Sequence, residues 1–196
     1  MSQGDQRPDG IAILDFGGQY CHLIARRVRE MNVYSEILPC DATVDEIQAT
    51  GGVMNLRGII LSGSPASLRL EDSPRLAEGV LEMGLPVLGL CYGHQLMSHM
   101  HGGEVRRGEK REYGITEATV DSPDGVLEGM DPVERVWMSH GDTVFTLPDE
   151  FEILAHTETS PVAAFRHRTK SLHGLQWHPE VVHTRRGQEM LSNFVL

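Results

Sequence analysis

The sequence predicts a single α/β domain with an open, mostly parallel sheet, helices on both faces and antiparallel additions in the C-terminal half. Three observations support this. The chain has 196 residues, a length typical of one domain, so residues 1–196 are taken as one unit. Over the first 80 residues, short apolar runs alternate with stretches of helical periodicity, the pattern of βαβ units. After residue 104, apolar runs follow one another with little helix between them, which favours antiparallel strands.

The N-terminal half contains four apolar runs bounded by turn residues, which predict strands at Gly10–Phe16, Val33–Leu38, Arg57–Leu61 and Pro86–Leu90. Helical spacing of apolar residues predicts helices at Tyr20–Met31, Thr43–Ala49, Ser73–Met83 and His94–His101. Ser73 is expected to cap the third of these helices, because Pro74 follows it at the first helical position. Gly102 is expected to end the fourth.

The C-terminal half contains five shorter apolar runs, which predict strands at Ile115–Val120, Arg135–Ser139, Glu152–Thr157, Ala163–His167 and Leu172–Trp177. We expect these strands to extend the edge of the parallel sheet. A closing helix is predicted near Arg186–Phe194. No composition shift or linker divides the chain.

Charge and cysteine usage exclude several classes of protein. With 17 basic and 28 acidic residues the net charge is −11, so a phosphate backbone or an anionic membrane surface would repel the chain, and no nucleic-acid or membrane partner is expected. The three cysteines form no C-x-x-C pair, which argues against a disulfide scaffold or a Cys-rich zinc site. No apolar run is long enough for a signal peptide or a membrane span, so a cytoplasmic location is predicted.

The segment Gly89–Gly93 (GLCYG) has the form of a nucleophile elbow, with Cys91 in place of the usual serine. It follows the most apolar predicted strand and precedes a helix. Glycines flank the sharp turn that such an elbow requires, and a helix N-terminus favours the thiolate form of a cysteine. A lone cysteine is often only a small buried side chain, but this context predicts that Cys91 is a nucleophile. Cys21 and Cys40 have no such setting and are interpreted as structural.

Two further segments complete the chemistry. In His178-Pro179-Glu180, residues two apart project to the same side of an extended chain, so Glu180 can orient His178 as the base of a Cys–His–Glu triad. The Ser62–Pro65 loop (SGSP) follows the strand expected beside the elbow, and its backbone N–H groups could join that of Tyr92 in an oxyanion hole. Each segment alone is also compatible with an ordinary surface pair or an ordinary turn.

Metal and nucleotide sites are not predicted. His94 and His101 share a helical face, but His99 lies off it and no carboxylate completes a ligand set. Gly17-Gly18 is not part of a G-x-G-x-x-G pattern, and neither Lys110 nor Lys170 follows a glycine, so no phosphate-binding loop is present.

Together these segments resemble the class I, triad-type glutamine amidotransferases. Several other segments resemble the branch of that family that serves GMP synthase, and they are spread over nearly the whole chain: DFGGQY (15–20), GLCYGHQLM (89–97), REYG (111–114), MSHGDTV (138–144) and GLQWHPEVVHT (174–184). The anthranilate and aminodeoxychorismate branches usually carry other motifs at these places.

The resemblance implies a role for each candidate residue. Cys91 would attack the side-chain carbonyl of glutamine, His178 would pass the proton to the departing ammonia, and Glu180 would orient His178. Backbone N–H groups of Ser64 and Tyr92 would hold the oxyanion. The residues implied in substrate binding are Gly63, Gln95, Ser139, His140, Gly141 and Asp142. Ser64 departs from the glycine usual in the family, but any residue except proline keeps the backbone donor.

The resemblance also implies partners. Glutamine would be the substrate, and a GMP synthetase subunit or domain of the ATP-pyrophosphatase type would use the ammonia to convert XMP to GMP. This chain lacks the S-G-G-x-D-S loop of such a synthetase, so no cofactor is expected here, and ATP and Mg would be used by the partner. Two alternatives remain: a glutaminase subunit for a chorismate-using synthase, and a non-catalytic regulatory module of the same fold, which would be expected to have a broken triad.

Overall fold

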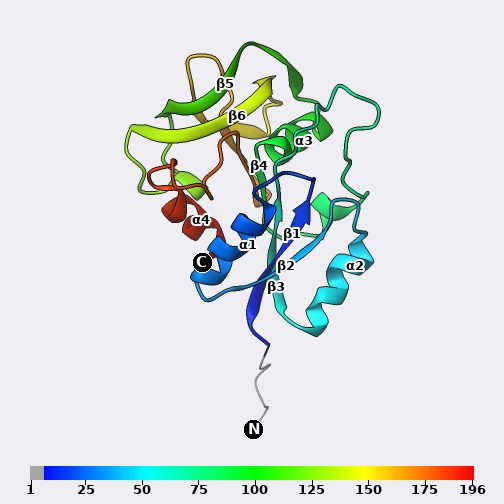
Figure 1. Cartoon of the computed structure of the whole chain (residues 1–196). Coiled ribbons are helices and arrows are strands. Elements are labelled where there is room, and N and C mark those ends of the chain that lie inside the picture. Colours follow the sequence, from blue (N-terminus) through cyan, green and yellow to red (C-terminus); the bar gives the residue numbers. More distant parts are fainter. Residues whose placement is uncertain (1–6) are drawn as a thin grey trace.

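The structure is a computed structural model that describes residues 7–196. Across these residues the chain forms one nine-stranded sheet in the order β2-β1-β3-β4-β9-β8-β7-β5-β6. Figure 1 shows its β5–β6 ribbon at the opposite end of the molecule from the start of β1. Helices cover both faces of its parallel half. The predicted fold class is therefore confirmed.

The parallel half consists of β1 (Asp9–Asp15), β2 (Tyr34–Pro39), β3 (Asn55–Leu61), β4 (Val87–Leu90) and β9 (Leu172–Leu175). All pairings among these strands are parallel. The last of them corrects an expectation, because Leu172–Trp177 was predicted among the antiparallel additions. Leu172 and Leu175 are fully buried, and the strand lies between β4 and β8 in the interior of the sheet.

The antiparallel half consists of β8 (Ala164–His167), β7 (Phe151–His156), β5 (Glu104–Val120) and β6 (Val133–Thr146). β5 and β6 are far longer than the predicted Ile115–Val120 and Arg135–Ser139. The added part of β5 is rich in Arg, Glu and Lys and mostly exposed, because it runs in a ribbon beyond the core (Figure 1). Apolar periodicity cannot reveal such a strand.

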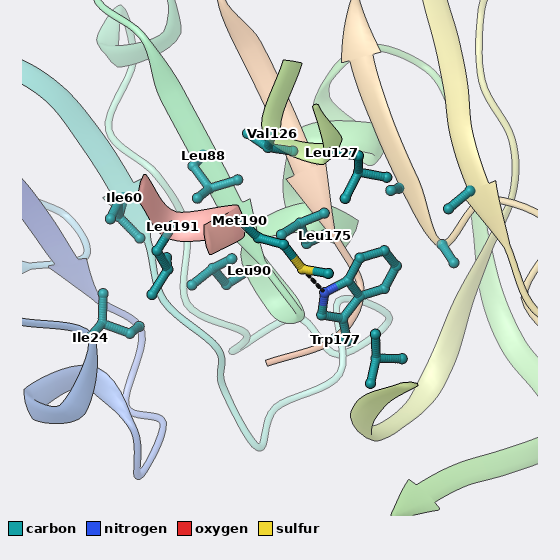
Figure 2. Packing of buried hydrophobic residues seen from close by; sticks show 14 of the residues in the cluster. Ile24, Ile60, Leu88, Leu90, Val126, Leu127, Leu175, Trp177, Met190 and Leu191 are labelled. Atoms are coloured by element: carbon teal, nitrogen blue, oxygen red, sulfur yellow. Dashed lines mark hydrogen bonds between the residues drawn. The ribbon is translucent and has the colours of Figure 1, made fainter. Parts of the chain in front are cut away.

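Two hydrophobic clusters lie on opposite faces of the sheet. Helices α1 (Cys21–Glu30) and α4 (Gly187–Val195) pack on one face, and α2 (Val44–Ala49) and α3 (Tyr92–Met100) on the other (Figure 1). In the first cluster the indole N–H of Trp177 donates to the sulfur of Met190 at 3.3 Å (Figure 2). This contact anchors the chain beyond β9 to α4, immediately before His178.

The predicted helix at Ser73–Met83 is wrong. That segment is irregular except for a 3₁₀ turn at Val80–Glu82; further 3₁₀ turns lie at Thr50–Gly52 and Gly125–Leu127. Gly79 adopts a left-handed φ of 84°, which a continuous helix cannot contain. The apolar side chains of Leu76, Val80 and Leu81 are still buried, and this burial produced the helical pattern in the sequence.

Within residues 7–196, none of the helices has both the length and the apolar character needed to cross a membrane.

Candidate active site

A cleft of about 660 Å³ opens where the parallel strands β1, β3, β4 and β9 end, and the β5–β6 ribbon forms its other wall. This volume is typical of small-molecule sites. The carboxyl ends of parallel strands are also where ligands bind in open α/β sheets. The cleft is lined by many of the residues selected from the sequence, namely Gly63, Ser64, Cys91, Gln95, Ser139, His140, Gly141, Asp142 and His178.

Cys91 lies at the turn between β4 and α3, as the elbow pattern predicts. Its φ of 51° and ψ of −100° are strained for a residue with a side chain, and it forms the N-cap of α3. The flanking glycines allow the close approach this turn needs. A Cβ on Gly89 would lie 2.5 Å from the carbonyl oxygen of Gly93, and one on Gly93 would lie 2.6 Å from that of Leu61. The strained turn thus places the Cys91 side chain at the floor of the cleft.

The His178–Glu180 pair lies beside this elbow. Nδ1 of His178 is 2.7 Å from Oε1 of Glu180, and both side chains are buried. Backbone contacts hold the segment in place: the N–H of His178 donates to the carbonyl of Trp137 at 3.0 Å, and the Thr184 hydroxyl donates to the carbonyl of His178 at 2.6 Å. The predicted two-residue spacing therefore yields an oriented imidazole.

The electrostatics of His178 connect it to both neighbours. Burial alone lowers its pKa, but charge interactions and hydrogen bonds with Cys91 and Glu180 outweigh burial and raise the pKa well above the usual 6.5. These interactions therefore favour the protonated imidazole. A proton next to the sulfur is the arrangement that a cysteine nucleophile and a general acid require.

Gly63 lies next to both the imidazole and the cysteine. A Cβ at this position would be 3.1 Å from Cε1 of His178 and 3.7 Å from Cβ of Cys91. The structure thus brings together three segments that are far apart in sequence, and a side chain at residue 63 would press on the imidazole. The hydroxyl of the preceding residue, Ser62, accepts a hydrogen bond from the N–H of Phe16 at 2.9 Å and so links the ends of β1 and β3.

Both candidate oxyanion donors lie at this end of the cleft. Tyr92 is the first residue of α3, where backbone N–H groups precede the intrahelical hydrogen bonds. Its ring is buried, and its hydroxyl donates to the carbonyl of Pro74 at 2.7 Å. Ser64 lines the cleft, and its hydroxyl accepts from the N–H of Ala66 at 3.1 Å. Among residues 7–196 the non-glycine residues with positive φ are Asn32 and Cys91, so Ser64 does not adopt the left-handed φ that favours glycine.

The opposite wall is built from the middle of β6. The carbonyl oxygen of Asp142 accepts from Nε2 of Gln95 and lies near Nδ1 of His140, both at 2.8 Å. The Asp142 carboxylate accepts from the hydroxyl of Ser67 and from Nε of Arg69, the latter at 3.2 Å. The predicted Ser139–Asp142 segment is therefore part of the cleft and is cross-linked to α3 and to the 62–72 loop.

Several residues in or next to the cleft had no role in the sequence analysis. The ring of Tyr20 meets that of His178 edge-on at 5.1 Å, and Gln176 donates to the Cys91 sulfur at 3.8 Å. Arg69, Arg107 and Arg111 add positive charge to the wall. Tyr20 and Arg111 fall within DFGGQY and REYG, so these motifs contained a signal, whereas nothing in the sequence marks Arg69.

The histidines considered for a metal are used otherwise. Nε2 of His94 lies 3.0 Å from the carbonyl oxygen of Val162, and Nδ1 of His101 lies 2.8 Å from that of Met97. His99 is exposed on the far end of α3. In the part of the chain that the structure describes, no group of three or more potential ligands is arranged to hold a metal ion.

Comparison with known proteins supplies a family. A family model described as glutamine amidotransferase class-I matches residues 12–196. The GMP synthase [glutamine-hydrolyzing] of Corynebacterium diphtheriae is 47% identical over 98% of this chain, and that of Acetivibrio thermocellus is 49% identical over 94%. These matches cover only 36% and 35% of the two relatives, so the chain spans about a third of their length.

Among solved structures, one from Thermoplasma acidophilum, provisionally described as a GMP synthase subunit, superposes on this chain with a TM-score of 0.83 and 29% identity. The alignment covers 97% of this chain and 94% of that one. The fold described above therefore also occurs as a chain of nearly the same length.

Proposed function

The chain belongs to the class-I glutamine amidotransferase family, and we propose that it hydrolyses the side-chain amide of glutamine and supplies the ammonia to a synthetase that converts XMP to GMP. The observation that carries this proposal is the hydrogen-bonded pair of Cys91 and His178, with His178 oriented by Glu180 and Gly63 next to both. A regulatory module would not need an intact triad, so its presence favours the enzyme.

Chemistry begins at Cys91. Its sulfur attacks the side-chain carbonyl carbon of glutamine, and the electron pair of the C=O bond moves to oxygen. The tetrahedral intermediate collapses, the C–N bond breaks, and the protonated His178 gives its proton to the departing ammonia. Water, deprotonated by His178, then attacks the thioester, which releases glutamate and restores Cys91. Glu180 keeps the imidazole oriented through both steps.

The oxyanion would be held by the backbone N–H groups of Ser64 and Tyr92. Ser64 lies in the loop that follows β3, and Tyr92 follows Cys91 at the start of α3, so the two proposed donors come from the ends of adjacent strands. The positive end of the α3 dipole adds to this stabilisation. Gly63 contributes by leaving room for substrate next to His178.

The amino-acid end of glutamine would bind at Gln95 and along Ser139, His140, Gly141 and Asp142. The carboxylate of Asp142 suits the α-ammonium group, and the guanidinium groups in the same wall suit the α-carboxylate. Asp142 is held by Ser67 and Arg69, which keeps it aimed into the cleft.

The acceptor of the ammonia is assigned from the relatives. The matched GMP synthases are about three times as long as this chain, and the remaining part of such a protein, as a domain or a separate subunit, is the proposed partner. That partner would use ATP and Mg, and the reaction would take place in the cytoplasm. Residues 1–196 would act as the single amidotransferase domain and need no cofactor of their own.

A four-way assay tests the proposal. Wild type and Cys91→Ala are each combined with an ATP-pyrophosphatase synthetase, ATP and XMP, and supplied with either glutamine or an ammonium salt. We expect wild type to form GMP from both donors, and Cys91→Ala to form it only from ammonium. We also expect the synthetase with its substrates to raise glutamine hydrolysis above the rate of the isolated chain.

Three results would overturn parts of the proposal. Loss of both activities in Cys91→Ala, with normal association, would show that Cys91 does more than release ammonia. Activation of a chorismate-using synthase, without any response to XMP, would assign the chain to the alternative branch. Absence of glutamine hydrolysis by wild type in either mixture would favour a regulatory module.

A further inference from the structure

We infer that Glu112, which lies outside the cleft, is a positioning residue that fixes the Ser139–Asp142 wall through His140. This inference rests on the proposed function, because that wall is where glutamine would bind. Glu112 does not line the cleft, whereas its neighbours Arg111 and Tyr113 and its contact His140 do. Its effect on the reaction must therefore be transmitted through His140.

The ribbon next to the cleft has an interrupted register. Arg107 pairs with Asp142 and Glu112 pairs with His140, so residues 108–111 of β5 face the single residue Gly141 of β6. Within such a bulge the regular ladder of backbone hydrogen bonds is lost, and backbone pairing alone does not hold the strand in place. The wall that carries Asp142 therefore needs another constraint at this level.

The Glu112 carboxylate provides this additional constraint on the wall. Nε2 of His140 lies 2.8 Å from this carboxylate, and the hydroxyls of Thr157 and Ser160 donate to it at the same distance. Burial raises the pKa of Glu112, but these hydrogen bonds outweigh it and lower the pKa to about 2, so the group is ionised. Its partners come from β6 and from the segment between β7 and β8, so one buried anion joins three parts of the antiparallel half.

A chain of contacts leads from Glu112 to the nucleophile. His140 connects the carboxylate to the carbonyl oxygen of Asp142, which also accepts from Gln95. Gln95 donates in turn to Gln176 at 3.1 Å, and Gln176 donates to the sulfur of Cys91. Removing the charge at Glu112 would loosen His140 and hence the Asp142 wall, while the elbow remains supported by β4 and α3.

The test compares Glu112→Gln with Glu109→Gln. Both variants remove one negative charge from the same part of β5, and neither residue lines the cleft. The two positions differ in burial, because Glu109 is exposed. We expect Glu112→Gln to lower kcat/KM for glutamine about 10- to 100-fold, mostly through KM, since a misplacement of about 1 Å costs on the order of 10²-fold. Glu109→Gln should match wild type. Iodoacetamide has no amino-acid end to bind along the wall, and Cys91 stays supported by β4 and α3, so alkylation of Cys91 should proceed at the wild-type rate in both variants.

The outcomes are distinguishable. Equal KM values in the two variants would reject the positioning role, as would a loss confined to kcat or a parallel loss of iodoacetamide reactivity. If Glu112→Gln does not fold, Ser160→Ala, which removes one of the hydroxyl donors, should still raise KM about threefold, and an unchanged KM would reject the inference. Failure of the proposed function would instead appear as absent glutamine hydrolysis in wild type.

Discussion

The two halves of the sheet serve the cleft in different ways. In the proposed mechanism the parallel half supplies the reacting groups, because Cys91, His178 and the Ser62–Pro65 loop all follow the carboxyl ends of its strands. The antiparallel half supplies a wall, the Ser139–Asp142 segment, whose position depends on the register of β5 against β6. The proposed function thus assigns chemistry and recognition to different architectures.

This division has a physical basis. At the end of a parallel strand the chain turns into a loop or a helix, so backbone donors and helix dipoles converge there without any particular side chain. An antiparallel ribbon offers no such convergence, and a side chain or a bulge must create its concave surface. Changes in the parallel half should therefore lower kcat, and changes in the ribbon should raise KM.

The largest effect in this set is expected at Glu180. Glu180→Gln keeps the shape of the side chain but removes the charge that helps to raise the pKa of His178, so the imidazole is both less well oriented and less readily protonated. Glutamine hydrolysis should fall about 10³–10⁴-fold in kcat, as in other triads whose orienting carboxylate becomes an amide.

Labelling of Cys91 by a glutamine-analogue electrophile provides the control, since the wall remains intact. Labelling should persist in Glu180→Gln. Its loss, or labelling mainly at Cys21 or Cys40, would contradict the roles assigned to the triad.

The next effect concerns the oxyanion donor at Ser64. Ser64→Pro removes the backbone N–H and should lower kcat about 10²–10³-fold, the usual cost of losing one such donor. Ser64→Gly keeps the donor and loses only the hydroxyl contact with Ala66, so its steady-state rate should be close to that of wild type. A folded Ser64→Gly protein with strongly reduced kcat would show that the side chain matters.

Most of the parallel half could be predicted from the sequence, because its features arise at strand ends from local sequence patterns. The elbow glycines, the two-residue spacing of His178 and Glu180, and the apolar strands are local patterns. The structure places the elbow and the His178–Glu180 segment at the carboxyl ends of these strands. Two expectations in this half were wrong. Leu172–Trp177 was assigned to the antiparallel additions although β9 pairs in parallel with β4, and at Ser73–Met83 burial of apolar residues imitated a helix although Gly79 turns the chain out of helical geometry.

The antiparallel half was harder to predict from the sequence, because its features depend on how distant strands pair with each other. The early part of β5 is polar and exposed, so no apolar pattern marks it. The contact between Arg69 and Asp142 joins residues 73 positions apart, and the four-to-one bulge opposite Gly141 exists only in the paired ribbon. The Ser139–Asp142 wall was found through family resemblance and not from composition or spacing.

A smaller effect is expected at Thr184, which ties the triad segment to β6. Its hydroxyl donates to the carbonyl of His178 and accepts from the N–H of Trp137 at 3.0 Å. Thr184→Val keeps the shape but leaves both buried backbone groups without this partner, at a cost of about 1–3 kcal/mol in the free energy of unfolding. We expect about a tenfold lower kcat with little change in KM.

Thr184→Ser is the matched variant, because it keeps the hydroxyl. Urea unfolding and steady-state kinetics should show it near wild type on both measures. A change in KM for Thr184→Val, with kcat preserved, would place Thr184 with the recognition wall and break the division between the two halves.

The smallest effect on catalysis is expected at His94, which joins the halves: it lies on α3, contacts Val162, and its ring packs on Phe165 of β8 at 4.9 Å. Burial lowers the pKa of His94 from 6.5 to about 3. Between these values the unfolded chain binds a proton that the folded chain excludes, so stability falls as the pH falls, by about 1.4 kcal/mol per pH unit at most. From pH 7 to pH 5 this contributes a loss of about 2 kcal/mol.

The variant His94→Gln tests this, because glutamine does not titrate in this range. Its free energy of unfolding in urea should be lower than that of wild type at pH 7 but should fall less steeply towards pH 5. Glutamine hydrolysis at pH 7 should stay within about threefold of wild type. All other titrating groups are shared by the two proteins. If the free energy of unfolding fell equally steeply with pH in both, His94 would not be the buried neutral group between the two halves of the sheet.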